Sequence, residues 1–338
     1  MESTRENLLS RILDGGDFAS LALEVFRFQA QYNATYSRYL KLLGVVPESV
    51  KALEQIPFLP VEAFKSNKVV TGEFIPEAVF KSSGTTDSTN RSEHSVRDVS
   101  WYHKVSMKVF SDIVRPVGGA EWFGLLPGYL ERGDSSLVEM VRNFMGEKAS
   151  DKRFFLHDYS ELSSAVKNEI IAERDVCILG VTHAILDMLE GGEWLEISDA
   201  ESEKLTIIET GGMKGHGREP IRSEVHDRIN KAVPSAKILS EYGMTELLSQ
   251  AYSLDGRFFE SPSWMRVMIK DTSDPMTQVE RGKTGRVQII DLANLDSCAF
   301  ISTSDLGRME AIEGSNRFEI LGRFDHSEVR GCNLLSVN

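Results

Sequence analysis

The alternation of strand and helix patterns between residues 78 and 240 limits the fold more than any other feature of this sequence. Short apolar runs typical of buried strands recur, and segments with helical periodicity separate them. Alternation at this interval indicates parallel βαβ units, so we predict the class α/β. The expected strands are 78–81, 122–126, 154–156, 175–180, 204–210 and 237–240, and the expected helices are 100–113, 136–144, 161–173, 184–190 and 220–232.

Different patterns flank this part of the chain. Residues 5–43 carry apolar side chains at helical spacing, and Pro47, Pro57 and Pro60 then divide the chain into short helices and a turn. After residue 251, short strands separated by turn signals indicate an antiparallel sheet or a small barrel, with strands at 258–260, 264–269, 285–290 and 318–322. We expect a helical N-terminal part (1–72), an α/β core (73–250), a β-rich subdomain (251–322), and a hinge and tail (323–338).

Charge and cysteine content exclude several classes of function. Among 338 residues, 51 are acidic and 38 are basic, so a net charge of −13 makes nucleic acid an unsuitable partner. Three scattered cysteines are too few for a disulfide framework, which fits a reducing cytoplasm. The charged N-terminus does not resemble a signal peptide, and the most apolar stretch, 176–189, is too short and too polar to span a membrane. We therefore expect a cytoplasmic protein.

The segment Ser82–Thr86 (SSGTT) follows the first predicted strand of the core and suits a phosphate group. Its small residues let backbone N–H groups converge, and its four hydroxyl side chains can donate to phosphate oxygens. It lacks the Lys-Ser/Thr ending of a P-loop, and a run of this composition is more often a capped turn. Considered singly, the segment leaves both interpretations open.

The segment Glu241–Glu246 (EYGMTE) also follows a predicted strand and offers groups suited to a nucleotide. Tyr242 can stack on a purine, and Thr245 and Glu246 place a hydroxyl beside a carboxylate suited to phosphate and Mg²⁺. A helix N-cap with an acidic first turn explains the same residues equally well.

Two later segments complete a set of four. Ser304–Gly307 (SDLG) contains an Asp that can accept hydrogen bonds from a ribose diol, and Gly322–Asp325 (GRFD) contains an Arg that can form a fork with phosphate. Each is an ordinary turn more often than a site. In this order, however, SSGTT, YGMTE, SDLG and GRFD resemble the motifs of the adenylate-forming superfamily. LPGYLERGDSSLVEMV (126–141), ETGGMKGHGREP (209–220) and GRFDHSEVRGCNLL (322–335) further resemble the acyl-protein synthetases, which activate fatty acids for bacterial luminescence.

The resemblance implies a fold, cofactors and site residues. The fold is the large domain of adenylate-forming enzymes, with βαβ subdomains, a barrel-like β-rich subdomain and the C-terminal small domain essentially absent. ATP and Mg²⁺ are the implied cofactors, and a fatty or other carboxylic acid is the implied substrate. Phosphate contacts fall on Ser82, Ser83, Gly84, Thr85, Thr86 and Thr245, and the adenine and ribose contacts fall on Gly211, Gly212, Tyr242, Gly243, Met244 and Asp305. Glu246 would bind Mg²⁺, and Arg323 would lie at the hinge beside the ribose or phosphate.

One departure from the superfamily concerns the catalytic lysine. In most members a domain that follows the GRxD motif brings a Lys to the adenylation site, whereas this sequence ends soon after Asp325. Either an internal cation, Lys214 or Lys81, replaces that lysine, or adenylation depends less on such a residue. A solvated surface side chain is the simpler interpretation of Lys214.

The acyl acceptor is the remaining question. We interpret Cys177 and Cys298 as packing residues, whereas Cys332 lies near the C-terminus beside Gly331 and close to Arg330, a cation that favours the thiolate. In acyl-protein synthetases a cysteine near the C-terminus accepts the acyl group, so the resemblance implies a thioester on Cys332 and an acyl reductase as partner. Two alternatives stay open. The acceptor can be free, such as coenzyme A, an amine or a sugar hydroxyl of a surface polysaccharide, or the chain can be a non-catalytic nucleotide-binding partner.

Overall fold

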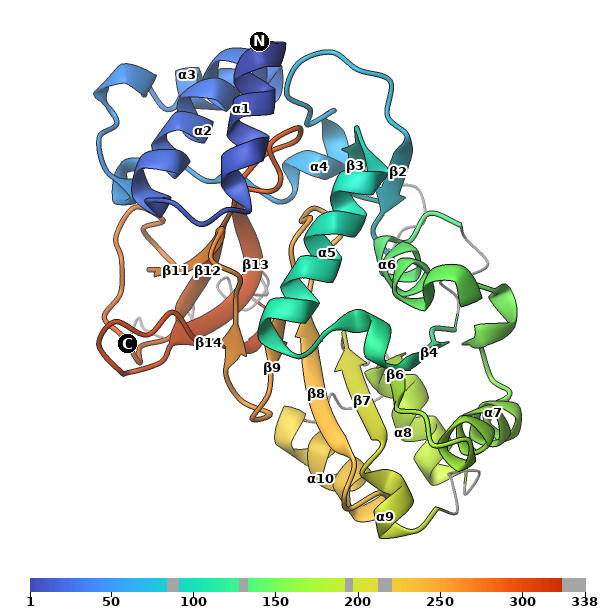
Figure 1. Cartoon of the computed structure of the whole chain (residues 1–338). Helices are drawn as coiled ribbons and strands as arrows, with labels where there is room; N and C mark the ends of the chain where they lie inside the picture. The colour runs from blue at the N-terminus through green and yellow to red at the C-terminus, as the bar shows by residue number, and fades with distance from the viewer. Residues whose placement is uncertain (84–90, 128–132, 192–196, 212–220, 324–338) are drawn as a thin grey trace, which may run out of the picture. The chain divides into compact units, whose positions relative to one another are not determined.

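The computed structural model describes residues 1–83, 91–127, 133–191, 197–211 and 221–323, and the chain forms two compact units (Figure 1). Unit 1 combines Met1–Ala63, Val69–Gly72 and Ser263–Asn338, and unit 2 combines Phe64–Lys68 and Glu73–Pro262. Unit 1 is therefore built from segments that lie on both sides of unit 2 in the sequence.

The sheet of unit 2 confirms the predicted parallel βαβ units. Its strand order is β10 (Phe259–Glu260), β9 (Ala251–Ser253), β8 (Lys237–Tyr242), β7 (Leu205–Thr210), β6 (Val176–Val181), β4 (Glu121–Leu125) and β5 (Phe154–Phe155). The strands from β8 to β5 run parallel, and β9 and β10 are antiparallel. Every residue of β4, β6 and β7 is buried, because helices cover a parallel sheet on both faces.

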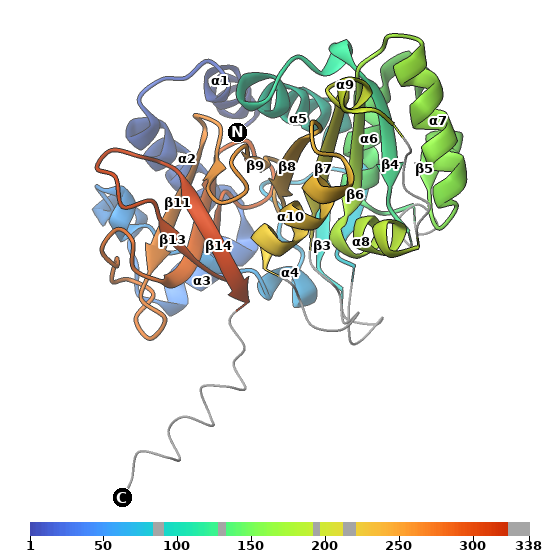
Figure 2. The ribbon, with the colours of Figure 1, turned by 90° about the horizontal axis from the view of Figure 1, so that it is seen from below.

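Helices cover both faces of this sheet (Figures 1 and 2). α5 (Val99–Ile113) and α6 (Ser136–Met145) lie on one face, and α8 (Thr182–Glu190) and α10 (Arg222–Ala232) lie on the other. α7 (Tyr159–Ile171) joins β5 to β6, and α9 (Asp199–Ser202), which the sequence did not predict, precedes β7. Asp98, Ser135 and Asp158 cap α5, α6 and α7 by accepting hydrogen bonds from backbone N–H groups of the first turn.

A separate hairpin in unit 2 carries the first motif. β2 (Ala78–Lys81) was expected, but its antiparallel partner β3 (Glu93–Val96) was not, and the two form their own two-stranded sheet. The strand at 78–81 therefore does not belong to the parallel sheet. The hairpin places residues 82 and 83 at the start of the connection between its strands.

Unit 1 contains the antiparallel sheet that the sequence predicted. β11 (Met265–Lys270), β12 (Gly285–Asp291), β13 (Phe300–Met309) and β14 (Phe318–Arg323) pair in this order, and the short strand β1 (Leu59–Pro60) runs parallel to β13. The interpretation of SDLG as a turn is wrong, because these residues lie within β13. Gly307 permits close strand packing, since a Cβ there would lie 2.6 Å from the Glu319 carbonyl oxygen and 2.8 Å from Val287 Cγ2.

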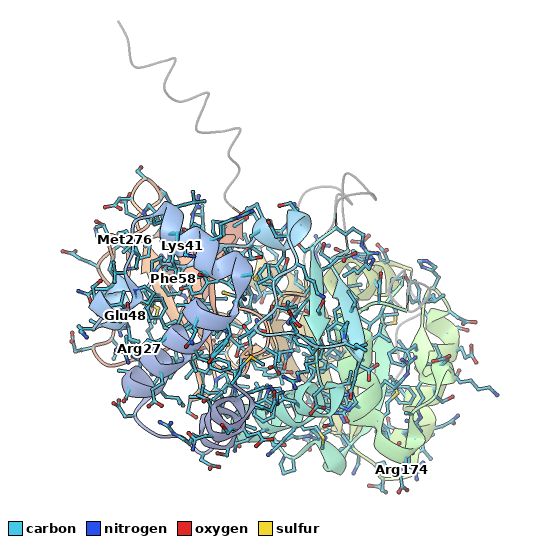
Figure 3. All side chains as sticks on the ribbon, turned by 90° about the horizontal axis from the view of Figure 1, so that it is seen from above. Arg27, Lys41, Glu48, Phe58, Arg174 and Met276 are labelled. Atoms are coloured by element: carbon cyan, nitrogen blue, oxygen red, sulfur yellow. The ribbon has the colours of Figure 1, made fainter. Side chains whose placement is uncertain are left out.

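Three helices complete unit 1, as the apolar spacing predicted: α1 (Glu2–Ile12), α2 (Phe18–Tyr32) and α3 (Ala34–Leu42). The helix expected from Pro47 is instead two 3₁₀ turns, Pro47–Ser49 and Leu53–Gln55, and a further short helix, α4 (Ala63–Ser66), follows β1. The ring of Phe300 packs against the rings of Phe26, Tyr36 and Phe58 at centroid distances of 6.0, 6.1 and 6.2 Å; Phe58 is labelled in Figure 3.

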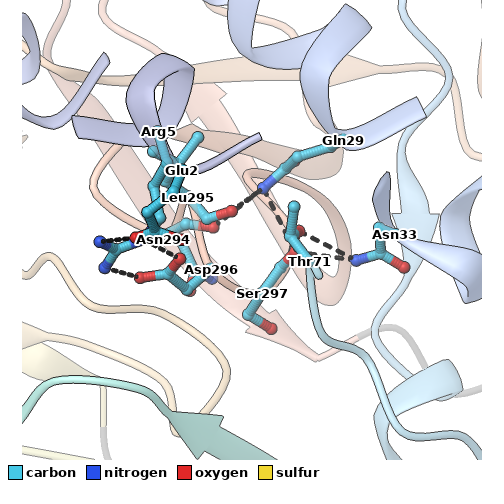
Figure 4. Close-up of polar contacts among 9 residues, drawn as sticks. All are labelled: Glu2, Arg5, Gln29, Asn33, Thr71, Asn294, Leu295, Asp296 and Ser297. Atoms are coloured by element: carbon cyan, nitrogen blue, oxygen red, sulfur yellow. Dashed lines mark hydrogen bonds and ion pairs between the residues drawn. The ribbon is translucent and has the colours of Figure 1, made fainter. Parts of the chain in front are cut away.

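A buried polar network joins the N-terminal helices to residues 294–299 within unit 1 (Figure 4). Arg5 donates two hydrogen bonds of 2.6 Å to the carboxylate of Asp296. The Gln29 amide donates to the carbonyl oxygens of Asn294, Leu295 and Ser297 and accepts from the backbone N–H of Ala299. These bonds satisfy backbone groups that burial would otherwise leave without partners.

Within the part of the chain that the structure describes, no helix combines the length and apolar character that crossing a bilayer requires.

Candidate active site

Two of the predicted nucleotide segments meet at the carboxyl ends of neighbouring parallel strands. Gly211 follows β7, and Tyr242 ends β8, with Thr210 and Glu241 in register between the two strands. Gly211 has φ +72°, a conformation that glycine adopts most readily. The half-buried Tyr242 lies with its ring centroid 5.7 Å from that of Phe259. Open α/β sheets bind ligands at this edge, where the carboxyl ends of their strands lie.

The first motif begins at a hairpin that side chains hold closed. The Ser82 hydroxyl accepts a hydrogen bond of 3.0 Å from the backbone N–H of Ser92, and Arg91 donates to the Ser82 carbonyl. The Arg91 guanidinium also forms a fork with Asp134, at distances of 2.8 and 3.0 Å. Both ends of the segment that contains SSGTT are therefore fixed. Sequence reasoning missed Arg91, because its partner lies 43 residues away.

His94 links the hairpin to the second motif, although no sequence pattern indicated this contact. Its side chain, 1% exposed on β3, places Nδ1 2.8 Å from the carbonyl oxygen of Thr245. Nδ1–H is the donor in this bond, because a carbonyl only accepts. The hairpin that leads into Ser82 and Ser83 is thereby held against YGMTE within unit 2.

Glu246, the predicted Mg²⁺ ligand, is buried, with 5% of its surface exposed. The described residues contain no cluster of three or more His, Cys, Asp or Glu side chains that could hold a metal ion. One carboxylate nevertheless fits the chemistry of Mg²⁺ in nucleotide enzymes, because the ion takes one or two carboxylates and completes its shell with phosphate oxygens and water. Glu246 is therefore suited to holding Mg²⁺ only together with ATP.

Asp305 and Arg323 are brought together in unit 1. They face each other in register on β13 and β14, and Arg323 Nε lies 3.6 Å from Asp305 Oδ1. The Arg323 side chain is 79% exposed, whereas that of Asp305 is 12% exposed. A nearly buried carboxylate beside an exposed guanidinium suits a ligand that carries both hydroxyl groups and negative charge.

Several predicted site residues lie outside the described residues: Gly84, Thr85, Thr86, Gly212, Lys214 and Cys332. Ser83 is described and follows Ser82, and Gly243 and Met244 are described and follow Tyr242.

Lys81, one candidate for the missing cation, ion-pairs with Glu93 across the hairpin at 2.7 Å. Its ammonium group is therefore already neutralised by a partner.

The two described cysteines are packing residues, as their sequence contexts suggested. Burial raises the pKa of the Cys177 thiol to about 11, against the opposing charge of Arg115. Burial also raises the pKa of the Cys298 thiol to about 12. Neither side chain supplies thiolate at neutral pH, since only the deprotonated sulfur is the nucleophile.

Solved structures show which class of fold this is. 2-Hydroxyisobutyryl-CoA ligase in complex with 2-HIB-AMP, in the postadenylation state, is 15% identical with a TM-score of 0.64 over 91% of this chain and 68% of that one. The same ligase in the thioesterification state is 16% identical, with a TM-score of 0.65 over 95% of this chain and 68% of that one. ATP-bound MatB from Rhodopseudomonas palustris is 16% identical, with a TM-score of 0.51 over 73% of this chain and 48% of that one. The chain has the fold of adenylate-forming ligases, as predicted.

The family assignment is more specific. The family model for acyl-protein synthetase, LuxE, matches residues 145–338, more than half of the chain. No curated protein sequence matches this chain. The chain belongs to the acyl-protein synthetase family, which confirms the resemblance found in the motifs. It is an AMP-forming ligase that uses ATP to activate a carboxylic acid.

Proposed function

We propose that this protein adenylates a fatty or other carboxylic acid and then transfers the acyl group to its own Cys332. The contact between His94 and Thr245 carries the proposal, because it brings the hairpin that holds SSGTT to YGMTE beside the carboxyl ends of β7 and β8. The described residues to which we assign phosphate, adenine and Mg²⁺ contacts, Ser82, Ser83, Tyr242 and Glu246, all belong to unit 2. The buried thiols of Cys177 and Cys298 support Cys332 as the acceptor.

In the first step, a carboxylate oxygen attacks the α-phosphorus of ATP and pyrophosphate leaves. The hydroxyls of Ser82 and Ser83 donate to phosphate oxygens, and Tyr242 stacks on adenine. The Asp305 carboxylate of unit 1 is suited to accept hydrogen bonds from a ribose diol. Glu246 would hold Mg²⁺, which would neutralise charge on the phosphate oxygens. In the second step, the Cys332 thiolate attacks the acyl carbon, a thioester forms and AMP leaves. An acyl reductase that consumes such a thioester is the partner this chemistry requires.

Two measurements separate the half-reactions. ATP–pyrophosphate exchange with a panel of carboxylic acids reads the first step and identifies the preferred acid. Mass spectrometry after incubation with ATP, Mg²⁺ and that acid reads the second. We expect Cys332→Ser to retain exchange and lose the acyl adduct, because a serine hydroxyl has a far higher pKa than a thiol.

Cys177→Ala is the matched control, since it also removes one thiol but from a buried position. It should retain both the exchange and the adduct. An acyl adduct that persists in Cys332→Ser, or that maps to another cysteine, would favour a free acceptor such as coenzyme A, an amine or a sugar hydroxyl. If the wild-type protein catalyses no exchange with any acid, the proposed first step is wrong.

A further inference from the structure

Glu209 is a buried carboxylate of unit 2 to which the proposed reaction assigns no role. It lies near the carboxyl end of β7, is 6% exposed, and faces α8 and α10. Burial acts to raise the pKa of Glu209, but hydrogen bonds from His226 and Ser240 outweigh this effect and hold the pKa below its usual value. The group is therefore an ion at neutral pH. A buried ion is costly unless nearby donors stabilise it, so these donors must be kept together.

Thr182 connects this carboxylate to Gly211, one of the predicted adenine contacts. It is the first residue of α8 and is 4% exposed. Its Oγ1 lies 2.8 Å from Glu209 Oε2 and 2.6 Å from the carbonyl oxygen of Gly211. A hydroxyl has one proton, which these two acceptors share. The hydrogen bond restrains the orientation of the Gly211 peptide group, at a residue whose positive φ favours glycine.

Arg222 is a second residue that contacts the Glu209 carboxylate. It is the first residue of α10, and its Nε lies 3.5 Å from Glu209 Oε1. Its guanidinium also lies over the ring of Phe259, 4.4 Å from the centroid. Through Thr182, the Glu209 carboxylate thus holds Gly211, which precedes residues 212–220 in the sequence. The same carboxylate directly contacts Arg222, which follows those residues.

We propose that Glu209 and Thr182 are positioning residues for ATP, acting through the placement of Gly211 and Arg222. The proposal rests on the proposed function, because it takes the carboxyl ends of β7 and β8 as the adenine site. Neither residue touches the reacting atoms. Their effect is on geometry, and displacements of about 1 Å in a catalytic site can lower rates about a hundredfold.

Thr182→Val tests the proposal, because it removes the hydroxyl and keeps the shape of the side chain. We expect the KM for ATP in pyrophosphate exchange to rise about tenfold, the loss expected for one buried hydrogen bond. The KM for the carboxylic acid should stay close to the wild-type value, whereas the midpoint of thermal unfolding should fall by a few degrees, because the buried Glu209 carboxylate loses a donor. Thr182→Ser, which restores the hydroxyl, should return the KM for ATP to near the wild-type value.

Thr206→Val is the matched control, since Thr206 is a buried threonine at the other end of β7. An unchanged KM for ATP in Thr182→Val would overturn the proposal, and so would an equal rise in Thr206→Val or an equal rise in the KM for the acid. Calorimetric titration with ATP separates this result from a failure of the proposed function. If wild type binds ATP without exchanging pyrophosphate, weaker binding to Thr182→Val still supports the positioning role, and equal binding refutes it.

Discussion

Glu241 should make the stability of this protein fall as the pH rises, and Glu241→Gln should remove that effect. The side chain is 7% exposed, accepts a hydrogen bond from the Thr210 hydroxyl, and lies near the buried rings of Tyr102 and Tyr252. Burial raises the pKa of Glu241 to about 7; the negative charge of Glu209 acts in the same direction, and the bond from Thr210 opposes them.

The sign of the effect follows from where the proton is held more tightly. In the unfolded chain the Glu241 carboxyl has an ordinary pKa of 4.5, so as the pH rises the unfolded state loses this proton first. Stability therefore falls between pH 4.5 and pH 7 and shows no further change from this group above pH 7. The full difference corresponds to about 3 kcal/mol, of which about 2.5 kcal/mol appears between about pH 5 and about pH 8.

Glu241→Gln keeps the shape and an oxygen that accepts from Thr210, but it does not titrate. We expect the variant to gain about 2.5 kcal/mol relative to wild type between about pH 5 and about pH 8, measured by urea unfolding at both values. Glu147→Gln, which changes an exposed carboxylate, is the matched control and should follow the wild-type pH dependence. If Glu241→Gln and wild type show parallel pH dependence, the carboxyl does not carry a raised pKa and the reasoning is wrong.

Two further variants test the metal ligand and the core of unit 1. Glu246→Gln should abolish Mg²⁺-dependent pyrophosphate exchange and leave the circular dichroism spectrum unchanged, because it removes a ligand charge and keeps side-chain volume; wild-type exchange would contradict the metal assignment. Phe300→Ala should lower the free energy of unfolding by about 3–5 kcal/mol in urea titration, because it removes a fully buried ring that packs against Phe26, Tyr36 and Phe58. A loss below about 1 kcal/mol would show that the surrounding rings close the cavity.

The parallel sheet could be predicted because its signal is local. Runs such as Val176–Val181 are apolar throughout, and a fully buried strand needs no partner to be recognised. The helices between these strands carry caps and apolar faces that are equally local. Their predicted bounds differ from the observed ones by only a few residues.

The missed strands depend on partners that sequence spacing does not reveal. β3 (EHSV) is polar at three of four positions and becomes a strand only because β2 pairs with it. The sequence of β13 includes Asp305 and Gly307, which suggest a turn, but its neighbours β12 and β14 supply hydrogen bonds on both sides. Here the tertiary context outweighs local preference.

The candidate site shows the same division. Tyr242 and Glu246 could be predicted as site residues because each residue type suggests a chemical role. The residues that hold the site together were not found, because their partners are remote. His94 lies 151 residues from Thr245, and the bond goes to a backbone carbonyl, which any residue at position 245 would provide. A single sequence carries no record of such a contact.

The discontinuity of unit 1 has a consequence for synthesis on the ribosome. Arg5 and Gln29 have hydrogen-bond partners at residues 294–299, so the helices that carry them cannot form these contacts until residues 294–299 have been synthesised. Unit 2, nearly continuous from Glu73 to Pro262, can fold during that interval. Until then, α2 presents Phe26 and Phe28 to the cell without the strands that later bury them. Apolar side chains of α2 therefore remain open to chaperones, and to aggregation, long after they have been synthesised.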